Sequence, residues 1–149
     1  MVSDQIELEI VIEAPVERVW SLVAEFAFGL PETELPNHDL HEGAVFVAGY
    51  PEVGRYPLRI EKIEPPRSLS YRWASAFPGE EPRVGNSTLI EFTLTAQGNR
   101  TRLNVMESGF ASLDAPEHTR NKAFDDNTKG WRMELDALKQ RAEAQLSRR

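Results

Sequence analysis

The chain has 149 residues, of which 40% are hydrophobic and 28% are charged. This balance excludes collagen-like, low-complexity and wholly disordered chains, and the length suits one domain with its own core over residues 1–149. The absence of cysteine excludes disulfides, thiol nucleophiles and thiolate metal sites. The formal net charge of −7 argues against nucleic acid and anionic membranes as partners, because both bind net basic surfaces.

The N-terminal segment is apolar but carries regularly spaced acids at Glu7, Glu9 and Glu13. These charges exclude the unbroken apolar core of a secretory signal. No other stretch approaches the ~20 apolar residues that a membrane-spanning helix needs. We therefore expect a cytoplasmic protein that does not insert into membranes.

The first two elements differ in the period of their apolar residues. Residues 6–13 alternate apolar and mostly acidic side chains, which predicts a strand with Ile6, Leu8, Ile10 and Ile12 toward the core. After Ala14-Pro15, helical spacing predicts a helix with one apolar face: Val16, Val19, Trp20, Val23 and Ala27. Gly29-Leu30-Pro31 ends this helix, and residues 31–43 are typical of a loop.

The middle of the chain contains a run of short strands. Five are expected: Ala44–Tyr50, Arg55–Ile63, Leu69–Phe77, Ser87–Thr95 and Thr101–Phe110. The turn-rich connections between them are too short for parallel crossovers, so an antiparallel meander is predicted. In the last third, spacings of 4-3-4-4 predict a long helix with one apolar stripe: Trp131, Leu135, Leu138, Ala142 and Leu146.

These elements predict an α+β fold with a six-stranded antiparallel sheet. One face of such a sheet can meet water, and the other needs the apolar cover that the terminal helix supplies. A curved sheet around one long helix tends to leave a cavity between them, where a small-molecule site belongs.

Several segments resemble one superfamily. Ala14–Trp20 is similar to the "AP-x-E-x-V-W" opening of the START/pollen-allergen-like (SRPBCC) superfamily. Ile60–Pro66 and Leu69–Trp73 resemble its "V-x-x-I-x-P-P…L-x-Y-x-W" hairpin, and Thr88–Leu94, Thr101–Val105 and Glu107–Phe110 resemble its later strands. Asn127–Trp131, with Leu135 and Leu138, resembles its "GW-x-x-x-L-x-x-L" terminal helix.

Within that superfamily these features mark the subfamily named after the activator of the heat-shock-protein-90 ATPase. The resemblance covers essentially the whole chain and implies the helix-grip fold, a curved six-stranded antiparallel sheet wrapped around a long C-terminal helix. The family includes lipid carriers, cyclases and co-chaperone domains, so function must be argued from the site.

Glu107 is the most informative polar residue. Period two with Leu103 and Val105 points its side chain to the inner face of the sheet, where burial favours a raised pKa. One interpretation is a polar anchor or acid/base group at the cavity. The alternative is a structural carboxylate bonded to backbone or to an arginine such as Arg59.

Aromatic residues are the other candidates. Tyr71 and Trp73 share one strand face, and further rings lie on elements expected to meet it. Plain core packing is the alternative for all of them. The predicted ligand-binding residues are Trp20, Tyr71, Trp73, Phe92, Glu107, Phe110 and Trp131.

No metal, cofactor or catalytic residue is assigned. His38 and His41, with Asp39 and Glu42 beside them, lie in the expected loop, where i, i+3 histidines do not converge on a metal. A solvated loop is the favoured interpretation of this segment.

The sequence leaves three functions open. The leading hypothesis is a small hydrophobic ligand-binding domain with an apolar cavity and no catalysis. A second is a polyketide cyclase/dehydratase-like enzyme with Glu107 or Tyr71 as acid/base. The third is a module that regulates a chaperone ATPase, with a chaperone or a second copy of the chain as partner.

Overall fold

The described part of the chain forms a six-stranded antiparallel sheet with two long helices against it. The computed structural model describes residues 4–28, 41–50, 54–77 and 79–146. The strands are β1 (Gln5–Ile12), β2 (Val45–Tyr50), β3 (Gly54–Glu64), β4 (Ser68–Trp73), β5 (Thr88–Gln97) and β6 (Arg100–Ser108). The helices are α1 (Val16–Phe28), the short 3-10 turn η2 (Phe110–Ser112) and α2 (Glu117–Leu146).

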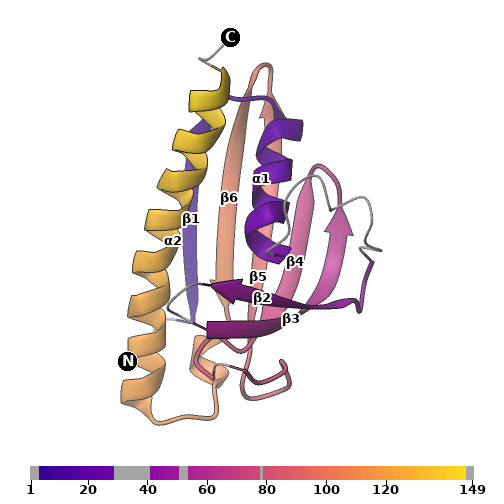
Figure 1. Cartoon of the computed structure of the whole chain (residues 1–149). Coiled ribbons are helices and arrows are strands. Elements are labelled where there is room, and N and C mark those ends of the chain that lie inside the picture. The colour runs from indigo at the N-terminus through magenta and orange to yellow at the C-terminus, as the bar shows by residue number, and fades with distance from the viewer. Residues whose placement is uncertain (1–3, 29–40, 51–53, 78, 147–149) are drawn as a thin grey trace.

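The strand order is β1-β6-β5-β4-β3-β2, so β2 to β6 form a meander and β1 joins β6. Figure 1 shows β2 and β3 swinging across the other strands, so the sheet curls toward its helices. The helix α2 packs along β1 and against α1 on the inner face. The predicted α+β architecture, a curved antiparallel sheet with a long C-terminal helix, is confirmed.

Alternation along each strand decides which side chains enter the core. In β6 the buried positions are Thr101, Leu103, Val105 and Glu107, as period two predicts. In β1, Ile6 and Ile12 are buried, while Leu8 and Ile10 are half-buried because β1 is an edge strand. The inner faces of all the central strands share one core with α1 and α2.

Two strands end earlier than predicted. The expected strand Leu69–Phe77 stops at Trp73, which pairs with Thr88, the first residue of β5, so β5 offers no partner beyond this point. The expected strand over residues 101–110 stops at Ser108, because Gly109 adopts a left-handed φ of 99° and turns the chain into η2.

The two predicted helices are confirmed with their apolar faces. Val19, Val23 and Ala27 of α1 are buried, and Trp20 is half-buried. The stripe of α2 is buried at four positions: Trp131, Leu135, Leu138 and Ala142. The side chain of Leu146 and most of the expected loop over residues 31–43 lie outside the described residues.

None of the helices in the described ranges is both long enough and apolar enough to span a membrane.

The apolar stripe of α2 predicts that two substitutions on this helix differ strongly in their effect on the free energy of unfolding. Leu138 is 2% exposed, so Leu138→Ala should lower the free energy of unfolding by about 2–5 kcal/mol through lost burial and a cavity. Met133, 74% exposed on the same helix, is the control, and Met133→Ala should change stability by about 0.5 kcal/mol or less. Urea denaturation of the three proteins measures both values; equal losses would mean that α2 does not cover the sheet.

Candidate functional site

A buried carboxylate lies where three strands and the long helix meet. Glu107 is the next-to-last residue of β6, and its side chain is 0% exposed on the inner face of the sheet. Beside it, β4 ends at Trp73 and β5 begins at Thr88, which pair with each other across the two strands. The helix α2 crosses this end of the sheet and brings Asn127 and Trp131, one turn apart, to the same carboxylate.

Four side chains donate hydrogen bonds to Glu107. Trp131 donates through Nε1 to Oε1 at 2.7 Å, and Trp73 donates through Nε1 to Oε2 at 3.1 Å. The Thr88 hydroxyl donates to Oε2 at 2.6 Å. The Asn127 amide lies 3.2 and 3.0 Å from the two carboxylate oxygens and 3.0 Å from the Ser75 hydroxyl. Because a carboxylate accepts about four hydrogen bonds, these donors fill its capacity.

All four donors are neutral, and no cation of the described residues pairs with this carboxylate. Arg59, the arginine that the sequence offered as a partner, instead bonds Glu61 at 3.2 Å and the carbonyl of Pro82 at 3.4 Å. Arg59 is therefore not the partner of Glu107, since it lies between the inward Leu58 and Ile60 and points to the outer face. Burial raises the pKa of Glu107 above its ordinary value of 4.5, and the four hydrogen bonds oppose this shift.

The aromatic candidates form a cluster around this carboxylate. The Trp131 ring contacts Trp73 at a centroid distance of 6.2 Å and Phe92 at 5.6 Å. Tyr71 contacts Trp73 at 6.2 Å and Phe92 at 6.4 Å. Four of the predicted ligand-binding rings therefore touch one another. We call Tyr71, Trp73, Phe92, Trp131 and Phe26 the aromatic cluster.

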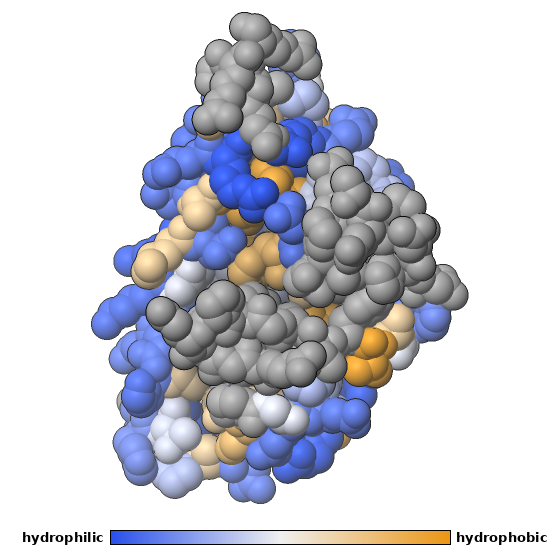
Figure 2. All heavy atoms as spheres, viewed as in Figure 1, coloured by the Kyte–Doolittle hydropathy of each residue, from blue (hydrophilic) through white to orange (hydrophobic). Residues whose placement is uncertain are grey.

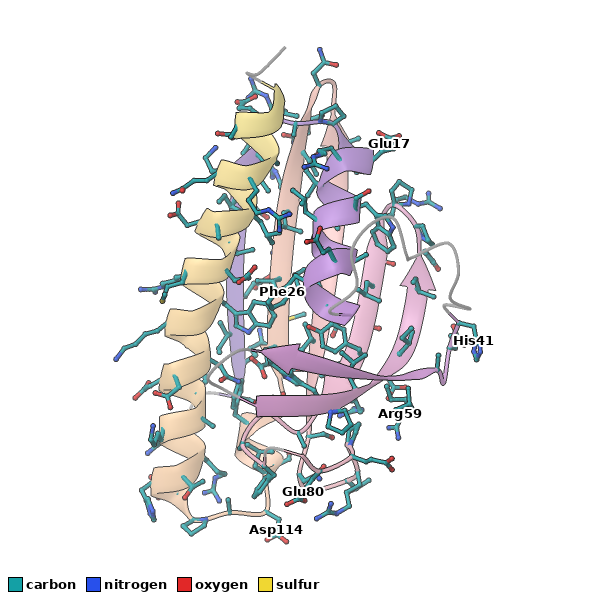
Figure 3. The ribbon with its side chains drawn as sticks, viewed as in Figure 1. Glu17, Phe26, His41, Arg59, Glu80 and Asp114 are labelled. Atoms are coloured by element: carbon teal, nitrogen blue, oxygen red, sulfur yellow. The ribbon has the colours of Figure 1, made fainter. Side chains whose placement is uncertain are left out.

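Phe26 was not among the predicted site residues. Its ring meets Trp131 edge-on at 5.7 Å, and Figure 3 shows Phe26 between α1 and α2. Phe26 follows Val23 by three residues and Val19 by seven, so helical spacing would have added it to the predicted apolar face. Phe26 and Trp73 are half-buried, whereas Tyr71, Phe92 and Trp131 are buried.

Two predicted residues lie apart from this cluster. Phe110 is buried in η2 and packs edge-on against Phe124 of α2 at 5.3 Å. Trp20 is half-buried on α1, and within the described ranges no aromatic ring contacts it. These two rings support the core and do not adjoin the Glu107 carboxylate.

Sequence reasoning also missed the polar partners of Glu107. Asn127 precedes Trp131 by four residues, which places both on one helical face. Thr88 precedes Ile90 and Phe92 at period two, which places it on the inner face of β5. Both signals were present, but neither tells which acceptor these side chains meet.

The histidine-containing segment provides no metal site that can be described. His38, Asp39 and Leu40 lie outside the described residues, and His41 is exposed, with Nδ1 2.8 Å from the carbonyl of Glu42. Among the residues with described positions, no three acidic or histidine side chains are grouped to hold a metal ion.

The raised pKa predicts how stability depends on pH. Between pH 4.5 and the pKa of Glu107 in the folded protein, the folded state binds more protons than the unfolded chain. The stability from this titration is therefore fully present below pH 4.5 and is lost as pH rises through the folded pKa. Glu107→Gln abolishes the titration, so wild-type stability relative to this variant should fall with rising pH in denaturant unfolding from pH 4 to 8.

Thr88→Val gives the matched test of the cause. It keeps the side-chain shape but removes one hydrogen bond that lowers the pKa of Glu107, so the titration should move to higher pH. Carboxyl ¹³C chemical shifts follow this change directly. A titration that moves to lower pH, or stays in place, would contradict the assigned hydrogen bond.

Comparison with solved structures confirms the fold. Protein MLL2253 from Mesorhizobium loti is 23% identical, with a TM-score of 0.67 over 91% of this chain and 94% of that one. DynU16, encoded in the dynemicin biosynthetic locus, is 20% identical, with a TM-score of 0.69 over 95% of this chain and 48% of that one. The Aha1 dimer from Colwellia psychrerythraea is 18% identical, with a TM-score of 0.65 over 96% and 97%.

A search of proteins with curated functions finds no match. The family model described as "Activator of Hsp90 ATPase homolog 1-like protein" matches residues 13–143. This range runs from the end of β1 to the last turns of α2 and includes Glu107 with all four of its hydrogen-bond donors. The chain therefore belongs to the activator of Hsp90 ATPase homolog 1-like family, within the START/pollen-allergen-like superfamily.

Proposed function

We propose that this chain binds a small hydrophobic molecule between α1, α2 and the inner face of the sheet. The observation that carries the proposal is the aromatic cluster with its two tryptophans fixed by one buried carboxylate. We also propose that the protein binds this molecule in the cytoplasm.

Two rings of the aromatic cluster are not fully buried. Phe26 and Trp73 are half-buried, and each contacts the buried ring of Trp131. In the view of Figure 2, hydrophobic atoms come to the surface along the line between α2 and α1. An apolar ligand seated there gains about 25 cal/mol for each Å² that it removes from water, which supports micromolar affinity after the costs of association.

Glu107 acts in this proposal as a positioning residue. Its two indole partners come from different layers, Trp73 from the sheet and Trp131 from α2. Hydrogen bonds to both N–H groups fix the ring planes before a ligand arrives, and such preorganisation lowers the entropy cost of binding.

The same contacts favour binding over acid–base catalysis. A general acid or base must lie within hydrogen-bond reach of the substrate proton. Glu107 is fully buried, and its oxygens already accept four hydrogen bonds. A substrate would have to displace one of these donors before it could exchange a proton with the carboxylate.

The structural neighbours do not decide between the candidate roles. DynU16 comes from a biosynthetic locus and the Aha1 neighbour is a dimer, but at 20% and 18% identity both carry the fold alone. We place the small-molecule role before a chaperone or homodimer role because of the aromatic cluster around Glu107.

Intrinsic fluorescence tests the proposal with the protein's three tryptophans. Titration with N-phenyl-1-naphthylamine, a neutral apolar fluorophore, should quench tryptophan emission saturably. Trp73→Phe and Trp131→Phe should each remove part of the quench, because these rings border the proposed site. Trp20→Phe is the control and should retain it, since Trp20 lies outside the aromatic cluster.

Thermal melts establish that each variant is folded before titration. If the neutral fluorophore and a panel of fatty acids leave emission unchanged, the aromatic cluster is only core. A quench that persists in full in both Trp73→Phe and Trp131→Phe would place the binding elsewhere.

A further inference from the structure

A pocket lies on the outer face of the sheet, opposite the aromatic cluster. Its volume is about 300 Å³, and it lies between the middle of β3, the end of β4 and the connection from β4 to β5. Arg59 and Arg72 enter it from the sheet, and Arg83 enters it from the connection. Ser87, Ser112, Val84, Gly85 and Gly109 complete its lining. Figure 3 shows Arg59 below β3 and Glu80 on the connection, at the same end of the sheet.

Two of the arginines stand directly opposite each other. Arg59 of β3 is the cross-strand partner of Arg72 of β4. Like charges in this position destabilise a sheet unless something neutralises them. A single carboxylate oxygen of Glu61 serves both, at 3.2 Å from Arg59 and 3.4 Å from Arg72. The Glu61 carboxylate can neutralise only one of the two guanidinium groups, so one positive charge of this pair remains uncompensated.

Arg72 has hydrogen-bonding capacity to spare. Its Nε lies 3.4 Å from Glu61, and within the described part of the chain its terminal nitrogens donate no hydrogen bond. Its side chain is 39% exposed and lines the pocket. A planar guanidinium with two such nitrogens matches the two oxygens of a carboxylate or phosphate group.

The third arginine is held in place by a structured connection. Arg83 bonds Glu80 at 2.9 Å, and its backbone N–H donates to the buried Asn86 at 2.7 Å. Asn86 also donates to the carbonyl of Glu81 at 3.0 Å, and the Ser87 hydroxyl donates to the carbonyl of Arg83 at 2.9 Å. These bonds shape this wall of the pocket before any ligand binds.

We propose that this pocket binds the oxyanion group, phosphate or carboxylate, of a small molecule. Three arginines against Glu61 and Glu80 give the pocket a charge of +1 on a chain whose net charge is −7. The oxyanion lies against the unoccupied nitrogens of Arg72 and offsets the uncompensated charge of the Arg59–Arg72 pair. The pocket and the aromatic cluster are on opposite faces, so this site does not depend on the proposed hydrophobic ligand.

The test is a titration of ¹⁵N-labelled protein with inorganic phosphate or acetate, against sodium chloride of equal ionic strength. Backbone amides of Gly85 and Gly109 and the side-chain Nε of Arg72 should shift saturably with phosphate, acetate or both. The stronger of the two responses identifies the oxyanion. Shifts no larger than those caused by chloride would overturn the proposal.

Three variants locate the binding. Arg72→Gln should weaken it about tenfold, because it removes a charged, two-pronged donor. Glu61→Gln should strengthen binding several-fold, since it removes the internal competitor for both arginines. Arg102→Gln, which removes an arginine paired with Glu9 elsewhere on the outer face, should leave it unchanged. Equal affinity in the Arg72→Gln and Arg102→Gln proteins would overturn the proposal even if oxyanions bind.

Discussion

The desolvated carboxylate of Glu107 is the constraint on which the site end of the molecule depends. A charge removed from water costs several kcal/mol unless hydrogen bonds or an opposite charge replace its hydration. Here four neutral donors take that place, and they come from β4, β5 and α2. Apolar packing alone tolerates small slides of a helix over a sheet. These directional bonds do not, so they fix where α2 crosses the strands.

The same end of the sheet presents different chemistry on its two faces. Thr88 is turned inward to Glu107, and its chain neighbour Ser87 lines the arginine pocket. On β4, Trp73 joins the aromatic cluster and its chain neighbour Arg72 faces outward. Because successive residues of a strand point to opposite faces, only the thickness of the sheet separates the apolar inner surface from the cationic outer surface.

The alternation of side chains along a strand predicted from the sequence on which face of the sheet several site residues lie. It placed Glu107, Tyr71 and Trp73 on the inner face, where the structure has them. The same rule, applied to Leu58 and Ile60, would have sent Arg59 outward and removed it as a partner for Glu107. Strand ends were less predictable, because β4 stops where β5 begins, and neither strand encodes the length of its partner.

The donors of Glu107 could not be assigned in advance for a related reason. Helical spacing puts Asn127 and Trp131 on one face of α2, but the residue they meet depends on the angle and height at which the helix crosses the sheet. The arginine pocket was beyond sequence reasoning as well. Arg59, Arg72 and Arg83 come from two strands and a connection, and only the cross-strand register brings the first two together.

The pairing of β1 with β6 has a consequence for how the chain reaches this structure. In this pair Gln5 lies opposite Ser108. Because the ribosome makes β1 before β6, β1 has no strand to pair with until β6 has emerged. Long-range pairing of this kind is slow to form and leaves a β-prone segment exposed in the meantime. Glu7 and Glu9 alternate with the apolar residues of β1, and charges in such positions oppose aggregation. The acidic residues on the outer face of β1 thus protect the nascent chain before they have any role in the folded protein.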